Sequence, residues 1–210
     1  KDRLPVICAD VESGKVSRLN KKNARPAVFL DRDGVLNRDM DKAPRAENFE
    51  LLPGVSEAVR LLNQSDYLSI VVTNQPMIAK GFVTFHDVDE VHKRLETELG
   101  NEKAYLDGIY FCPHHPEKGF PGEVAELKID CGCRKPKPGM LLRAKEDFNI
   151  DLQSSWMIGD RDSDMQAGKN AGCHTILVGD TISGSTAADY RFPNLLEAVR
   201  FILTRKENND

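Results

Sequence analysis

The sequence lacks an apolar run long enough to cross a membrane, and it lacks a strong excess of charge of either sign. Spanning a bilayer takes about 20 apolar residues, and no stretch of the 210-residue chain approaches that length. Lys and Arg number 29 against 33 Asp and Glu, for a net charge of −4. We therefore predict neither a nucleic-acid partner nor a membrane partner.

Cysteines are few and odd in number, which argues against a disulfide framework. There are five, and no secretory leader is recognisable, although the chain begins at Lys1 and the question of a removed leader stays open. Three of the cysteines lie near a histidine between residues 112 and 133. Such a group is typical of a metal site in a reducing compartment, so we predict a cytoplasmic protein.

The length suits one medium-sized domain with short tails. Residues 1–26 are mostly polar, with a basic stretch from Arg18 to Arg25, and are predicted to form a tail or linker that includes a short strand at Val6–Ala9. Residues 27–205 are predicted to form the folded domain, and residues 206–210 a C-terminal tail.

Short apolar runs alternate with amphipathic stretches through the predicted domain. The runs are predicted to be strands at Ala27–Leu30, Leu68–Val72, Gly108–Phe111, Ser155–Ile158 and His174–Val178. Helices are predicted near residues 55–62, 84–99, 138–148, 164–171 and 194–204, the second behind a Thr84–Asp87 capping box. Continuous apolar strands separated by helices predict an α/β fold with a doubly wound parallel sheet.

Acidic residues follow two of the predicted strands. Asp31 and Asp33 end the first, and Asp160 and Asp164 end the fourth. Ligands of open parallel sheets bind at the carboxyl ends of the strands, so these carboxylates are expected to converge there. Converging carboxylates repel unless a cation is present, and oxygen ligands of this kind suit Mg²⁺. The plain alternative is a set of solvated loop acids or helix caps.

Four motifs in order resemble those of the haloacid dehalogenase superfamily of phosphatases. They are Phe29-Leu30-Asp31-Arg32-Asp33-Gly34-Val35-Leu36-Asn37, Val72-Thr73-Asn74-Gln75, Arg134-Lys135-Pro136-Lys137-Pro138-Gly139, and Ile158-Gly159-Asp160-Arg161-Asp162-Ser163-Asp164. The resemblance covers residues 27 to about 198. It implies a Rossmann-like fold and a Mg²⁺-dependent phosphatase that acts on a small phosphate ester.

The resemblance also implies roles for the acidic residues. Asp31 would attack phosphorus and become an aspartyl phosphate, and Asp33 would protonate the leaving alcohol and then activate water. Mg²⁺ would bridge Asp31, the backbone carbonyl of Asp33, and Asp160. Gly34 would let backbone amides approach the phosphate, and Asp164 would orient the site or a metal-bound water.

The remaining motif residues would bind phosphate. Thr73 and Asn74 would donate hydrogen bonds to the phosphoryl oxygens, and Lys135 would supply positive charge. Gln75 is predicted to contact substrate, and Arg161 to support the site.

Cys112-x-His114 and Cys131-x-Cys133 are predicted to form a zinc site. Three thiolates and one imidazole make a closed tetrahedral set that suits structural zinc. The residues between the two pairs have little apolar content, so a bound ion would order the loop. The alternatives are four unrelated residues or a redox pair of Cys131 and Cys133.

The zinc loop resembles that of the heptose 1,7-bisphosphate phosphatases and of the related histidinol-phosphate phosphatases, and the residues after Gln75 match the heptose group better. That resemblance implies hydrolysis of the 7-phosphate, no large cap domain, and Arg134 as a contact for the second phosphate. Pro76 and Met77 depart from the usual Ser-Gly, and a Gly-Tyr after the first motif is missing. A catalytically silent, zinc-stabilised binding module is the rival interpretation.

The segment Glu12–Asn20 resembles the junction that joins such phosphatases to a sugar nucleotidyltransferase. A fused or linked nucleotidyltransferase is one interpretation, and a simple tail is the other. We expect the phosphatase itself to be a monomer.

Overall fold

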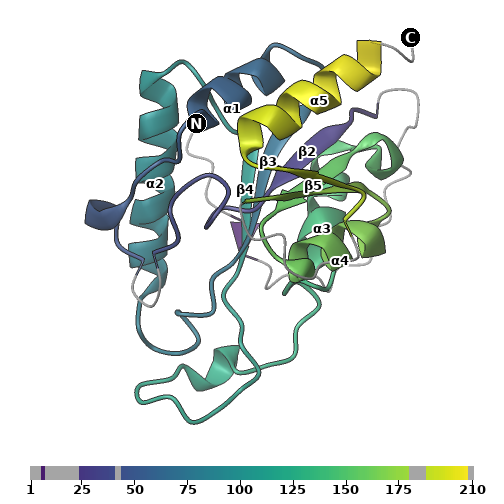
Figure 1. Ribbon diagram of the computed structural model, residues 1–210. Coiled ribbons are helices and arrows are strands. Elements are labelled where there is room, and N and C mark those ends of the chain that lie inside the picture. Colours follow the sequence, from purple (N-terminus) through teal and green to yellow (C-terminus); the bar gives the residue numbers. More distant parts are fainter. Residues whose placement is uncertain (1–5, 8–23, 41–43, 180–187, 208–210) are drawn as a thin grey trace.

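The computed structural model describes residues 6–7, 24–40, 44–179 and 188–207. Its seven strands form a single parallel sheet in the order β1-β4-β3-β2-β5-β6-β7 (Figure 1). The strands are β1 (Val6–Ile7), β2 (Ala27–Leu30), β3 (Leu68–Asn74), β4 (Gly108–Cys112), β5 (Trp156–Gly159), β6 (His174–Val178) and β7 (Tyr190–Phe192). The prediction of a doubly wound parallel sheet is confirmed.

Alternate residues of each central strand face opposite layers of helices. On β2, Val28 and Leu30 pack in the core beneath helices α1 (Val55–Asn63), α2 (Phe85–Asn101) and α5 (Leu195–Glu207). Ala27 and Phe29 pack on the other face, beneath α3 (Gly139–Phe148) and α4 (Asp162–Ala171) (Figure 1). Because both faces are covered, the strands show continuous apolar runs in the sequence.

Local sequence signals set the helix ends. Thr84 accepts a hydrogen bond from the Asp87 backbone N–H while the Asp87 side chain accepts from the Thr84 backbone, so the predicted capping box at α2 is present. Asn194 caps the backbone N–H of Glu197 at the start of α5. Pro138, expected in the first turn of α3, lies one position earlier as its N-cap.

The ends of the chain add to the domain. β1 pairs with the edge of β4, and Arg25 binds the backbone of Asp66 and Asn149, so parts of the predicted N-terminal tail contact the domain. Helix α5 extends to Glu207, into the predicted C-terminal tail. The strand β7 was not predicted, because three residues show too short a pattern. The junction-like segment Glu12–Asn20 lies outside the described residues.

The residues that the structure describes contain no large cap domain. The connection from β4 to α3, residues 113–138, contains one short 3-10 turn at Ala125–Leu127, and two further 3-10 turns lie at Ala46–Asn48 and Leu152–Ser154. None of the described helices is long and apolar enough to cross a membrane.

Candidate active site

A pocket of about 400 Å³ opens where β2, β3 and β5 end. It contains residues from all four motifs. The predicted site residues that line it are Asp31, Asp33, Thr73, Asn74, Gln75, Arg134, Lys135, Arg161 and Asp164. Segments more than 100 residues apart in sequence therefore meet at one end of the sheet, as the parallel topology requires.

Lys135 links two of the buried carboxylates. Its Nζ lies 2.9 Å from Asp31 Oδ1 and 2.6 Å from Asp164 Oδ1, and it donates to the Val72 carbonyl at 2.8 Å. Burial disfavours the charged amine, but Asp164 and Asp31 outweigh it and raise the pKa of Lys135. The lysine is therefore a fixed cation beside Asp31.

Asn74 fixes the backbone of Lys135. Its amide donates to the Lys135 carbonyl at 3.1 Å and accepts from the Lys135 N–H at 3.1 Å. This reciprocal pair ties the end of β3 to the segment that carries the lysine. Asn74 was predicted to bind phosphate, and much of its hydrogen-bonding capacity is instead used to position Lys135.

Three carboxylates lie close enough to share a cation. One oxygen each of Asp31, Asp160 and Asp164 falls within 4.8 Å of the others. Burial is the main cause that raises the pKa of Asp31 to about 7 and also raises the pKa of Asp160. Asp160 Oδ1 is buried and has no hydrogen-bond partner among the described residues. An unpaired oxygen beside crowded carboxylates fits a divalent cation with oxygen ligands.

Two glycines make this crowding sterically possible. A Cβ on Gly34 would lie 2.4 Å from Asp160 Oδ2, and Gly34 has φ of +84°. A Cβ on Gly159 would lie 2.2 Å from the Asp164 Cβ. Gly34 was predicted to let amides approach phosphate, but the structure gives it a further role, which is to leave room for the Asp160 carboxylate.

The Asp33 carboxylate is held by three neighbours. Arg32 reaches both of its oxygens at 2.9–3.2 Å, Asn37 Nδ2 donates at 3.0 Å, and Gln75 Nε2 donates at 2.9 Å. Burial alone would raise the pKa of Asp33, but the Arg32 charge and these hydrogen bonds outweigh it and lower the pKa. Gln75, predicted to contact substrate, lines the pocket, donates to Asp33 and also donates to Thr73 Oγ1 at 3.0 Å.

Two arginines lie at the mouth of the pocket. Arg134 is half-buried, and its Nη1 donates to the His114 carbonyl at 3.4 Å. Arg161 is exposed and pairs with Asp39 at 2.6 Å, with Asp160 further away at 3.6 Å. Met77 replaces a small residue of the resembled motif and also lines the pocket. The pocket lining therefore contains two arginines, and Arg161 is already paired with a carboxylate.

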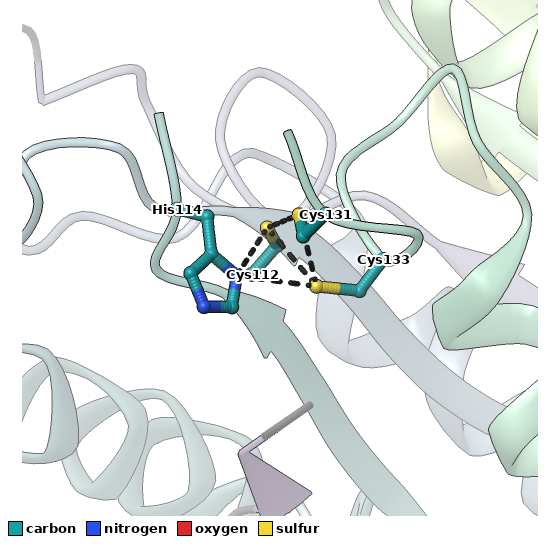
Figure 2. Close-up of side chains that lie close together, drawn as sticks. All are labelled: Cys112, His114, Cys131 and Cys133. Atoms are coloured by element: carbon teal, nitrogen blue, oxygen red, sulfur yellow. Dashed lines mark hydrogen bonds between the residues drawn. The ribbon is translucent and has the colours of Figure 1, made fainter. Parts of the chain in front are cut away.

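The four predicted zinc ligands come together at the end of β4 (Figure 2). The three sulfurs lie 3.3–3.5 Å apart, and His114 Nδ1 lies 3.7 Å from the Cys112 sulfur and 3.5 Å from the Cys133 sulfur. Tetrahedral zinc with Zn–S bonds of about 2.3 Å separates its sulfurs by about 3.8 Å. These residues could hold such an ion with a small expansion. His115 points instead towards Glu117 and Phe120.

The loop that carries this cluster has a small core that the sequence did not reveal. The ammonium groups of Lys80 and Lys128 lie 4.6 and 4.7 Å from the centre of the Phe120 ring. Phe82 meets the same ring edge-on, and the Val124 N–H donates to the Ala79 carbonyl at 3.0 Å. The loop is thereby fastened to residues 79–82, which follow the second motif.

Sequence reasoning missed three residues near Asp33: Arg32 and Asn37, which contact its carboxylate, and His92, which contacts Arg32. Arg32 and Asn37 lie inside the first motif but were given no role. His92 is buried on α2, and its Nε2 lies 3.1 Å from Arg32 Nη1. Its position in the sequence could have indicated that His92 is buried, because helical spacing places it on the same face of α2 as Val88 and Leu95.

A doubly wound sheet with a lysine and four carboxylates at its strand ends defines a class of phosphate-ester hydrolases. The family model described as HAD-hydrolase-like matches residues 132–197. The D-glycero-β-D-manno-heptose-1,7-bisphosphate 7-phosphatase of Yersinia pestis is 40% identical over 185 residues, which are 86% of this chain and 96% of that protein. The D-glycero-α-D-manno-heptose-1,7-bisphosphate 7-phosphatase of Burkholderia mallei is 40% identical over 84% of this chain and 93% of that protein.

A solved structure with the same fold carries a similar name. The D,D-heptose 1,7-bisphosphate phosphatase of B. bronchiseptica, complexed with magnesium and phosphate, superposes with a TM-score of 0.74 at 29% identity, over 86% of this chain and 99% of that one. The chain belongs to the haloacid dehalogenase (HAD) family of phosphoric monoester hydrolases, in the branch whose members are named heptose-1,7-bisphosphate 7-phosphatases.

Proposed function

We propose that this enzyme hydrolyses the 7-phosphate of D-glycero-D-manno-heptose 1,7-bisphosphate, a step in making heptose for lipopolysaccharide or other surface glycans. The observation that carries the chemistry is Lys135 Nζ at 2.9 Å from Asp31 in a pocket that also contains Asp33. The printed activities of the relatives support the choice of sugar.

In the proposed reaction, an oxygen of Asp31 bonds to phosphorus while the bond from phosphorus to the sugar oxygen breaks. Asp33 gives a proton to that oxygen, and later takes one from the water that hydrolyses the aspartyl phosphate. The contacts to Asp33 favour its ionised form, which the second step requires. Lys135 offsets the negative charge that gathers around phosphorus, and Thr73 contributes its hydroxyl.

Mg²⁺ is the proposed catalytic ion, held by the side chains of Asp31 and Asp160 and by the backbone carbonyl of Asp33. When bound, it supplies positive charge that neutralises the carboxylates and the phosphoryl oxygens. Asp164 keeps Lys135 in place at 2.6 Å. A neighbour solved with magnesium and phosphate, at 29% identity, supports this assignment.

Zinc is the proposed ion of the Cys112, His114, Cys131 and Cys133 cluster, with a structural role. Cys133 is followed directly by Arg134 and Lys135. An ion bound there would therefore fix the segment that brings both cations to the pocket. Thiolate ligands survive in a reducing compartment, which supports a cytoplasmic location.

The second phosphate is proposed to meet Arg134 at the mouth of the pocket. The guanidinium can bind phosphate through two parallel hydrogen bonds. The proposed enzyme acts as a monomer on this small molecule, and the link to a nucleotidyltransferase through residues 12–20 stays a prediction.

The test is phosphate release from both anomers of the heptose 1,7-bisphosphate, with histidinol phosphate as competitor and ³¹P NMR of the product. We expect the 1-phosphate to be retained and kcat/KM to be far higher for the bisphosphate. A higher kcat/KM for histidinol phosphate would overturn the proposed sugar. No turnover of any phosphomonoester would favour the silent binding module.

A further inference from the structure

Arg32 is a buried cation whose hydrogen bonds are divided between two elements. It is fully buried at the end of β2, and its Nε and Nη2 donate to the two oxygens of Asp33. Its Nη1 lies 3.1 Å from Nε2 of His92 on α2. Because Arg32 continues the side of β2 that carries Val28 and Leu30, it points towards α2.

The His92 ring acts as an acceptor for Arg32. A guanidinium can only donate, so the contact requires a lone pair on Nε2 and places the ring proton on Nδ1. Burial and the Arg32 charge lower the pKa of His92 to about 3, which agrees with a neutral ring.

The opposite side of the same ring is poorly satisfied. His92 Nδ1 is buried and has no hydrogen-bond partner among the described residues. The ring packs against Phe111, with ring centres 5.5 Å apart. An apolar side chain would suit these surroundings better than a histidine with an unmet donor. The contact with Arg32 is thus the feature of His92 that an apolar residue would lack.

The geometry points to His92 as a positioning residue that acts through Arg32 to orient the Asp33 carboxylate for proton transfer to the leaving group. This inference rests on the proposed role of Asp33 as acid and base. Without the acceptor, Arg32 Nη1 would lose its partner inside the core, and the guanidinium would turn to find another. The Nε and Nη2 groups of Arg32, which donate to both oxygens of Asp33, would then shift, and the carboxylate would move with them.

The test compares two leaving groups in the full-length, metal-loaded enzyme. A sugar oxygen needs a proton to leave, whereas nitrophenolate leaves from p-nitrophenyl phosphate without one. kcat/KM reports the steps up to transfer of the phosphoryl group to Asp31, so it isolates the protonation of the leaving group. We expect His92→Leu to lower kcat/KM for heptose bisphosphate by roughly 10²-fold and to change that for p-nitrophenyl phosphate little.

Two further variants sharpen the test. His92→Gln places an oxygen near the position of Nε2 and should restore most of the loss. His86→Leu removes an exposed histidine from the same helix and should leave both substrates unaffected. The ratio of the two kcat/KM values does not depend on the fraction of folded protein, so poor folding of His92→Leu would not imitate the result.

An equal loss for both substrates in His92→Leu would overturn the inference, as would a His92→Gln enzyme as impaired as His92→Leu. Failure of the proposed function looks different. In that case the unmodified enzyme would fail to hydrolyse the heptose bisphosphate, and a change in the ratio could still be measured with any alkyl phosphate that it accepts.

Discussion

The carboxylate pocket and the cysteine cluster are both assembled from distant segments, but they are ordered by different means. In the pocket, charged side chains meet partners of opposite sign, with Lys135 between Asp31 and Asp164 and with Arg32 against Asp33. In the cluster, the three sulfurs lie 3.3–3.5 Å apart and His114 Nδ1 lies 3.5–3.7 Å from two of them, and all four atoms could bind a metal. The pocket is therefore ordered largely by ion pairs within the chain, although the unpaired Asp160 oxygen suits a cation, whereas the cluster holds only groups that can bind a metal.

The two regions are joined by two peptide bonds. Cys133 belongs to the cluster, Arg134 faces the mouth of the pocket, and Lys135 lies at its floor. The Asn74 side chain holds this segment from the β3 side. The positions of Arg134 and Lys135, the proposed phosphate-binding cations, therefore depend on both regions, although only the pocket is proposed to contact substrate.

The largest expected effect is a loss of activity without a loss of folding when the proposed nucleophile is replaced. Asp31→Asn removes the nucleophile and should lower kcat by about 10⁴-fold or more, as measured by steady-state phosphate release. The fold should persist, because Lys135 keeps its contact with Asp164. Zinc content and far-UV circular dichroism should therefore match the unmodified enzyme. Substantial activity in this variant would refute Asp31 as nucleophile.

The next effect breaks the cluster. Cys133→Ser should reduce bound zinc from one per chain to a small fraction, lower the melting temperature and reduce kcat/KM, because the segment before Lys135 loses its anchor. Elemental analysis and calorimetry measure the first two quantities.

Cys173→Ser is the matched control, since this buried cysteine lies between α4 and β6 and is not one of the four grouped ligands. It should retain one zinc per chain. Equal zinc content in the Cys133 and Cys173 variants would contradict the assigned ligands.

EDTA treatment should abolish activity, and Mg²⁺ should restore it while zinc remains bound.

The third effect concerns the buried histidine His92, whose neutral ring should make the stability of the protein depend on pH. Folding lowers the pKa of His92 from 6.5 to about 3, so between these values the unfolded chain binds the extra proton and stability falls as the pH falls. Between pH 7 and pH 5 this single group should remove about 2 kcal/mol from the free energy of unfolding. Urea unfolding at the two pH values measures it. His92→Gln lacks the titration, so its loss should be smaller by that amount; identical losses would show that His92 does not titrate in this way.

The smallest expected effect concerns the join between the regions. Arg134→Ala should lower kcat/KM for the heptose bisphosphate roughly 10-fold more than for the 7-monophosphate of the same sugar, because only the bisphosphate offers a second phosphate. Arg161→Ala is a useful comparison, because this second guanidinium of the pocket lining is paired with Asp39. An equal reduction of kcat/KM for both substrates in Arg134→Ala would show that Arg134 does not bind the second phosphate.

Local sequence signals predicted most of the architecture. The β2 and β6 strands match their predicted bounds, and the capping box at Thr84 begins α2 as expected. The motifs also named most of the residues that line the pocket, because parallel strands place their carboxyl ends at one edge, but not Asp39, Met40 and Pro44. Short or boundary features were less accurate: β7 was missed, and α4 begins at Asp162 rather than near Asp164.

The sequence by itself determined which groups are available for the proposed chemistry: an aspartate pair, a lysine, two further aspartates, and a set of sulfur and nitrogen atoms that could bind a metal. Each of these is a matter of residue type and spacing along one segment. Only the tertiary structure decided how those groups are supported. The contacts of Gln75 with Asp33, of Asn74 with Lys135, and of His92 with Arg32 join residues 42 to 61 positions apart. Such pairings depend on which strands and helices become neighbours and on how closely their side chains approach, and no local pattern encodes those distances.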